Sequence, residues 1–178
     1  IDEAGNQINQ VLPTINNPYW IRNENRSDRD DTRLLANVSL TYSLLKNLSL
    51  TGKVGYDYNI DNRFLNNRKG TAQRVDGSFF VDKINNSQLN ADILATYNTA
   101  IGQDFNINVI SGYNYNQRLR SSETLTGTSL LVPQLFDPGN VEQSIAGRTF
   151  REHILLGLYS SVDLTFRDYL TLTLSGRN

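Results

Sequence analysis

The sequence predicts an all-β chain whose six strands form one antiparallel segment of a larger transmembrane β-barrel. Three observations predict this fold: apolar and polar residues alternate along six runs, the runs have about 10 to 12 residues each, and tight and long connections alternate between them. Successive strand residues point to opposite faces, so the alternation predicts one apolar and one polar face per strand. A tilted strand of about 10 residues is long enough to cross a bilayer.

The first three expected strands show this period of two. Strand 33–43 reads RLLANVSLTYS, with its apolar residues mainly at even positions. Strand 48–59 reads LSLTGKVGYDYN, again with an apolar even face. Strand 89–98 reads LNADILATYN, and here the odd positions carry the apolar face. None of the three has the repeat of about 3.6 residues that would indicate a helix.

The last three expected strands repeat the pattern. Strand 105–116 reads FNINVISGYNYN, strand 153–164 reads HILLGLYSSVDL, and strand 169–178 reads YLTLTLSGRN. In a barrel the apolar faces contact lipid and the polar faces line the lumen. The residues expected to face lipid are Val38, Leu40, Leu50, Val54, Ile93, Ile107, Val109, Leu156, Leu158 and Leu172. Those expected to face the lumen are Asn37, Thr41, Asp57, Asp92, Asn108, Asn114 and Asp163.

The connections alternate in length. Three are tight and join consecutive strands at residues 44–47, 99–104 and 165–168. Two are long, at 60–88 and 117–152, and the leading segment 1–32 is expected to be a third long loop. Short periplasmic turns and long extracellular loops are typical of outer-membrane barrels, whereas repeated loops of this length are rare in compact soluble domains.

Composition excludes several classes of protein. The formal net charge of -1 lacks the basic excess of a nucleic-acid-binding protein. The absence of cysteine excludes disulfides, zinc–thiolate sites and cysteine nucleophiles. The chain does not begin with Met, and it ends directly after a strand-like run. Because single-chain bacterial barrels have at least about 8 strands, we expect further strands of a longer polypeptide to complete this one.

Several motifs, in order, resemble one family. They are NPYW (17–20) followed by NEN (23–25), NVSLTY (37–42), LSLTGKVGYD (48–57), GYNY (112–115), LVPQLF (131–136), LGLYSSVDL (156–164), DYL (168–170) and GRN (176–178). Together they resemble SusC-like (SusC/RagA) TonB-dependent transporters of Bacteroidetes, over nearly the whole chain.

The resemblance implies an outer-membrane barrel of about 22 strands with an N-terminal plug. It also implies uptake of oligosaccharides or peptides, a SusD-like surface lipoprotein as an extracellular lid, and energy supplied by TonB. The plug, the TonB box and the final barrel strand are expected to lie outside this chain. Outer-membrane lipid is the remaining expected partner.

The leading segment contains the candidate contacts for a ligand or partner. Tyr19 and Trp20 could form an aromatic platform that stacks on sugar or anchors a protein, with Asn23 and Asn25 beside them. The alternative is that the aromatic side chains pack the segment onto the barrel rim. Aspartates and arginines at 22–33 are expected to neutralise one another in solvent rather than bind calcium.

No residue is expected to be catalytic, and no metal or cofactor is expected. His153 is the only histidine, and Asp57, Asp92 and Asp163 lack the pairing that a hydrolase needs. The chain is therefore expected not to be an enzyme. Two alternatives to a transporter segment stay open: a non-transporting outer-membrane adhesin or scaffold built on a similar barrel, and a soluble β-sandwich that binds carbohydrate.

Overall fold

The structure, a computed structural model, describes residues 2–3, 5, 7–8 and 14–178. Within this part of the chain, one short helix and one 3-10 turn accompany six strands. The elements are α1 (Pro18–Glu24), β1 (Ser27–Leu45), β2 (Leu48–Asn67), β3 (Ser78–Ile101), β4 (Phe105–Leu130), η1 (Pro138–Asn140), β5 (Val141–Phe166) and β6 (Leu170–Arg177). No helix in the described part of the chain is long and apolar enough to span a membrane.

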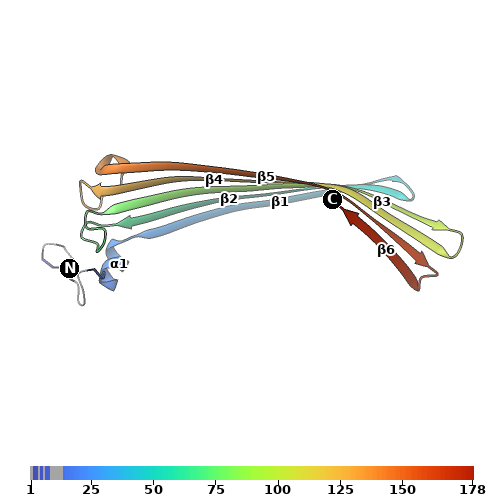
Figure 1. The fold of residues 1–178 in the computed structure, drawn as a ribbon, viewed down its shortest axis with the longest axis horizontal. Helices are drawn as coiled ribbons and strands as arrows, with labels where there is room; N and C mark the ends of the chain where they lie inside the picture. The colour runs from blue at the N-terminus through green and yellow to red at the C-terminus, as the bar shows by residue number, and fades with distance from the viewer. Residues whose placement is uncertain (1, 4, 6, 9–13) are drawn as a thin grey trace. The chain divides into compact units, whose positions relative to one another are not determined.

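The six strands form one antiparallel sheet in which each strand pairs with its neighbours in sequence, in the order β1-β2-β3-β4-β5-β6 (Figure 1). The register of the last pair runs from Tyr159 opposite Arg177 to Phe166 opposite Leu170. Antiparallel neighbours can be joined by tight turns, so this order follows from the short connections. The predicted fold class, an antiparallel barrel segment of six strands, is confirmed.

Two of the tight turns are tied to each other. Arg167 and Asp168, between β5 and β6, have φ angles of 46° and 60°, in the left-handed region that Asp tolerates better than most residues. Arg167 donates from its Nε to Asp104 Oδ1 at 2.8 Å and from its backbone N–H to the Asp104 carbonyl at 2.7 Å. The turn after β5 is thereby fixed to the turn between β3 and β4.

The structure corrects the expected loop bounds. The strands continue past their expected ends, so the loops expected at 60–88 and 117–152 are reduced to 68–77 and 131–140. The expected loop 1–32 contains α1 and the first residues of β1. The added strand residues are mostly polar, and their apolar residues, such as Phe79, Phe80 and Ile84, do not keep to one face, so these segments lack the alternation that marks a strand in the sequence. The added residues still pair through their main chains with the neighbouring strands. The periodicity of a sequence does not report such pairing.

The chain divides into two compact units, described separately below. The loop-side unit, Ile1–Thr32, Asn59–Asn85 and Arg120–Arg151, contains α1 and the loops 68–77 and 131–140. The turn-side unit, Arg33–Tyr58, Asn86–Leu119 and Glu152–Asn178, contains the three tight turns. Within the described residues, every buried apolar side chain belongs to the loop-side unit: Trp20, Ala72, Phe79, Ile84 and Leu130.

Glycines make close packing possible in the loop-side core. A Cβ on Gly127 would collide with the ring of Phe79, which is almost fully buried. Gly77, with a φ of 76°, leaves the space that Leu130 occupies. The turn-side unit has no comparable core, so its apolar side chains must find another environment.

Candidate functional site

In the turn-side unit, the residues expected to face the lumen lie in a hydrogen-bonded polar face. Asp57 accepts two hydrogen bonds from the Arg33 guanidinium, at 2.9 and 2.6 Å. The hydroxyls of Thr41 and Thr51 are 2.9 Å apart, and the Asn37 side chain fills the space over Gly55. Strands β1 and β2 therefore hold each other's polar side chains in fixed orientations.

Strands β3 and β4 carry a cluster of four amide and carboxylate side chains. Asn114 donates to Asp92 Oδ1 at 2.8 Å and to Asn90 Oδ1 at 3.1 Å. Asn116 donates to Asn90 Oδ1 at 3.0 Å, and Asn90 donates to Asp92 Oδ2 at 2.9 Å. The Oδ1 atom of Asn116 is buried and has no hydrogen-bond partner among the described residues.

Sequence reasoning selected Asp92 and Asn114 from this cluster but missed Asn90 and Asn116. Their position on the polar face, at the same period, could have identified both. In a sheet, cross-strand neighbours on one face lie about 5 Å apart, close enough for short amides to bond directly.

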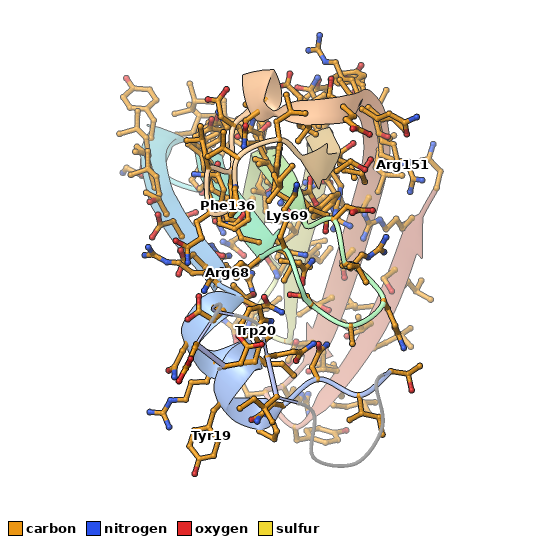
Figure 2. All side chains as sticks on the ribbon, turned by 90° about the vertical axis from the view of Figure 1, so that its left-hand side faces the viewer. Tyr19, Trp20, Arg68, Lys69, Phe136 and Arg151 are labelled. Carbon is orange, nitrogen blue, oxygen red and sulfur yellow. The ribbon has the colours of Figure 1, made fainter. Side chains whose placement is uncertain are left out.

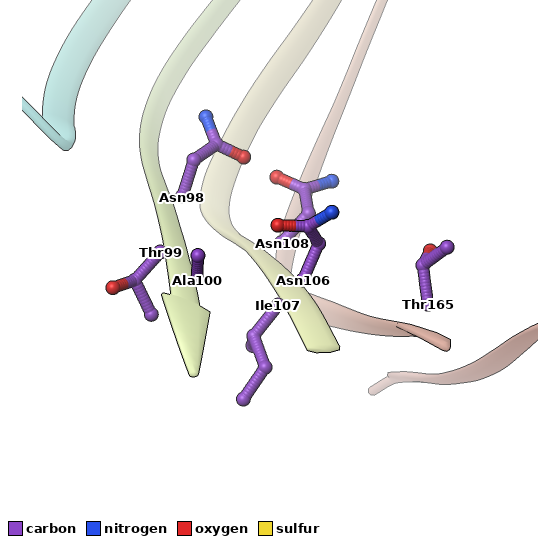
Figure 3. A pocket seen from close by; sticks show the side chains of 7 residues that line it. All are labelled: Asn98, Thr99, Ala100, Asn106, Ile107, Asn108 and Thr165. Carbon is purple, nitrogen blue, oxygen red and sulfur yellow. The ribbon is translucent and has the colours of Figure 1, made fainter. Parts of the chain in front are cut away.

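Strands β4, β5 and β6 complete the polar face of the turn-side unit. Asp163 accepts from Asn108 at 3.0 Å and from the Thr173 hydroxyl at 2.7 Å. A hollow of about 370 Å³ lies nearby, and its lining includes Asn106, Ile107 and Asn108. Figure 3 shows the amides of Asn106 and Asn108 on one side of β4, while Ile107 points to the other. The same strand thus presents a polar and an apolar surface one residue apart.

Most of the residues expected to face lipid are exposed in the described chain. Val38 and Leu40 are 70% and 73% exposed. Six more are exposed, Leu50, Val54, Ile93, Leu156, Leu158 and Leu172, and two are half-buried, Ile107 and Val109. A soluble β-sandwich buries such side chains under a second sheet, and the described residues form only one sheet.

In the loop-side unit, Asp61 is a buried carboxylate that two arginines hold by hydrogen bonds. It is 3% exposed and accepts from Arg63 at 2.5 and 2.9 Å and from Arg29 at 2.9 and 3.0 Å. The hydrogen bonds from Arg63 lower the pKa of Asp61; burial opposes that shift, and the guanidinium of Arg29 adds to it. Sequence reasoning missed this site because Asp61 falls in what was expected to be a loop.

At the start of β1, where calcium binding was the alternative to mutual neutralisation, aspartates and arginines form ion pairs. Arg26 Nε lies 2.5 Å from Asp28 Oδ2, and Arg29 NH2 lies 3.3 Å from Asp31 Oδ2. These carboxylates are at least partly exposed and are paired with neighbouring guanidiniums, as in a mutually neutralised surface.

The four candidate contacts at the N-terminal end are of two kinds, and Figure 2 labels two of them, Tyr19 and Trp20. Trp20 is only 3% exposed; its Nε1 donates to Thr71 Oγ1 at 3.0 Å and the Arg68 guanidinium lies 5.2 Å from its ring centroid. Asn25 accepts from Thr71 Oγ1 at 2.9 Å and from the Arg68 N–H at 3.2 Å. These two residues fasten α1 to the loop 68–77, so the packing interpretation applies to Trp20.

Tyr19 and Asn23 are exposed, and a role in contacting a ligand or partner stays a prediction for them. Tyr19 is 76% exposed, and Figure 2 shows it at the edge of the side-chain cluster. A small hollow of about 110 Å³ is lined by Gln7, Ile8, Asn17, Tyr19, Trp20, Asn23 and Glu24. The helix is positioned by Asn17, whose side chain accepts from the Tyr19 N–H at 2.9 Å, and by Pro18 in its first turn.

Comparison with known proteins identifies the class of fold. No protein-family model matches the sequence, and no curated protein matches it. Solved structures do match, and those described below are of transporters, so the fold is that of a barrel segment of a transporter.

The matching structures include three of one complex. A structure of the RagAB peptide transporter matches with a TM-score of 0.83 and 13% identity. The RagAB peptide importer in its closed-closed and open-open states matches with TM-scores of 0.78 and 0.76, at 14% and 15% identity. Each match covers 92% of this chain and 19% of the other, so this chain spans about a fifth of their length. The prediction of a SusC/RagA-like barrel fragment is confirmed at the level of the fold.

Proposed function

We propose that this chain is part of the barrel wall of a TonB-dependent nutrient importer in the bacterial outer membrane. One observation carries the proposal: the sheet of a transporter barrel bears an uncovered aliphatic face and a self-bonded polar face on the same strands. We infer that the first face contacts lipid and the second lines an aqueous lumen.

The energetic argument concerns the uncovered face. Apolar surface in contact with water costs about 25 cal/mol per Å², and large contiguous apolar patches are rare on soluble monomers. Lipid removes that cost without a second protein layer. The polar face supports the same inference. Its side chains form hydrogen bonds with one another, and the face itself stays open to water and solute.

The proposed solute is a peptide or oligosaccharide, and the proposed partners are a SusD-like lipoprotein lid and TonB. The similar solved structures are of a peptide transporter, which supports the peptide alternative. TonB would act through a region outside this chain. We propose no catalytic role, because the carboxylates of the polar face are engaged by arginine, amide and hydroxyl groups.

The test uses the full-length protein in its own host. We expect membrane fractionation to place it in the outer membrane, and we expect deletion of the gene to abolish uptake of its labelled peptide or oligosaccharide. Recovery of the protein in the soluble fraction would contradict the proposal. Outer-membrane insertion with no uptake of either solute class would favour the adhesin or scaffold instead.

The proposed contact with a lid or solute is tested at Tyr19. We expect Tyr19→Ala to weaken capture of the lipoprotein or uptake of solute, because it removes an exposed aromatic anchor. Tyr169→Ala is the matched control: Tyr169 is exposed to a similar degree, 74%, but lies in the turn after β5. Equal effects of both substitutions would contradict a specific role for Tyr19.

A further inference from the structure

A polar hollow in the loop-side unit lies across strands β4 and β5. Its volume is about 420 Å³, and it is lined by Arg120, Ser122, Thr149 and Arg151. Figure 2 labels Arg151 on its strand. Two guanidiniums and two hydroxyls give the hollow an excess of hydrogen-bond donors, because arginine cannot accept a hydrogen bond.

The register of the two strands places the arginines opposite each other. Glu123 pairs with Arg148 at 3.6 Å, and the Thr124 hydroxyl lies 3.5 Å from the Gly147 carbonyl. Continuing this antiparallel register puts Ser122 opposite Thr149 and Arg120 opposite Arg151. By the two-residue period of β4, Arg120 and Ser122 share the parity of the polar-face residue Asn114, whereas Glu123 has the opposite parity.

Like charges directly opposite each other destabilise a sheet, so a pair of arginines needs a counter-charge. Among the described residues, neither Arg120 nor Arg151 forms an ion pair. The nearby Asp82 carboxylate instead accepts from the Ser122 hydroxyl at 2.7 Å. On the other face of β5, Arg148 has Glu123 as its partner, whereas Arg151 has no ion pair among the described residues.

We propose that Arg120 and Arg151, with the Thr149 hydroxyl, form a subsite that binds a carboxylate of the transported solute. The inference rests on the proposed import function and adds the chemical class of solute: an anionic one. Guanidinium groups bind carboxylates through paired N–H donors, and an anion between them removes the repulsion across the strands. The carboxylate belongs to an acidic peptide or to a uronic-acid oligosaccharide.

The experiment measures binding to the full-length protein in detergent by calorimetry. The probes are an Asp-rich hexapeptide and its Asn counterpart, and a galacturonate trimer and its methyl ester. We expect one acidic probe to bind more tightly than its neutral match. Arg120→Gln and Arg151→Gln should each weaken that binding by about tenfold, the loss of one charged hydrogen-bonding partner, while neutral probes are unaffected. Arg148→Gln is the matched control and should leave all affinities unchanged.

Stability provides the second readout. Without ligand, each substitution should leave thermal unfolding unchanged or raise its midpoint, since repulsion is relieved. A lowered midpoint would mean that a carboxylate of the protein itself fills the hollow, and it would overturn the proposal. Equal binding of acidic and neutral probes, or equal loss of both in the variants, would also overturn it. Uptake of neutral solutes, measured in parallel, tests the import function separately.

Discussion

At the scale of single residues, the loop-side unit depends on a buried carboxylate and a few close glycine contacts. Asp61 is held by two guanidiniums, from Arg29 and Arg63. A buried carboxylate is stable only when it is paired and hydrogen-bonded. Neutralising Asp61 leaves Arg63 without its ion-pair partner among the described residues and Arg29 with only Asp31. The loss of stability should therefore exceed that from neutralising an exposed carboxylate.

Asp61→Asn should therefore destabilise the full-length protein, with a dependence on pH. Because the pKa of Asp61 is lowered in the folded state, its contribution is present above the ordinary carboxyl pKa and is lost as pH falls through the lowered one. We expect the difference in thermal midpoint between wild type and variant to be constant near neutral pH and to shrink below about pH 4.

The control is Asp28→Asn, because Asp28 pairs with Arg26 on an exposed surface. Exposed ion pairs contribute about 0 to 1 kcal/mol, so little change in midpoint is expected at any pH. If the two variants had the same midpoint, or if the Asp61 effect grew in acid, the assigned role of Asp61 would be wrong.

A second residue-scale prediction concerns Gly127. Gly127→Ala should destabilise the protein by about 1 to 3 kcal/mol, the usual cost of overpacking a core, because the new methyl would collide with the Phe79 ring. Gly52→Ala is the control, since no heavy atom lies within 4 Å of a Cβ built there, and it should change the free energy of unfolding by less than about 0.5 kcal/mol. Denaturant unfolding measures both, and a neutral Gly127→Ala would contradict the packing.

At the scale of the strand, the two faces have different roles. Leu40 is 73% exposed, and its neighbour Thr41 bonds to Thr51 on the other face. The β5–β6 register places Leu164 opposite Leu172 and Asp163 opposite Thr173, so each face keeps its character across neighbouring strands. A single-residue shift of register would exchange the faces, which makes the alternation itself the determinant of pairing.

A charge scan tests which face contacts lipid. Arginine at Leu40, Val54, Ile93 or Val109 should cost about 2 to 4 kcal/mol if these positions lie near the bilayer midplane. Arginine at Thr41 or Asn108 should cost less, because the lumen is hydrated. The measurement is equilibrium unfolding of the full-length barrel from lipid vesicles. Similar costs on both faces would be inconsistent with the proposed orientation.

At the scale of the whole chain, the distribution of buried residues limits what this segment can do by itself. All buried apolar side chains of the described residues belong to the loop-side unit. Strands β1 and β6 are the edges of the sheet, each with one paired neighbour in the described chain. Unpaired edges promote aggregation in water and are not tolerated in lipid.

The 178-residue chain produced alone should therefore not form a stable soluble monomer. We expect aggregation, or sedimentation as large oligomers, in the absence of detergent, and no cooperative thermal transition by circular dichroism. A monomeric chain with a sharp transition would show that the sheet buries its aliphatic face without lipid, and the barrel assignment would then need revision.

The sequence by itself predicted six strands, each with an apolar and a polar face, because alternation with a period of two reports which side of a strand is apolar. The resemblance to SusC-like transporters predicted the barrel fold, and the structure confirms a barrel segment. The sequence assigned Asp57, Asp92, Asn114 and Asp163 to the polar face through the same alternation. It did not predict the strand extensions, because their apolar residues, such as Phe79, Ile84 and Leu130, do not alternate with a period of two.

Only the tertiary structure decided which polar residues meet and which aromatic residue is buried. Trp20 and Tyr19 are adjacent in sequence, yet Trp20 is buried against Arg68 and Thr71 while Tyr19 is exposed. Likewise Arg120 and Arg151 are separated along the chain and become opposite neighbours through the register of β4 and β5. Such contacts depend on how segments distant in sequence are brought together, and a local pattern contains no information about that.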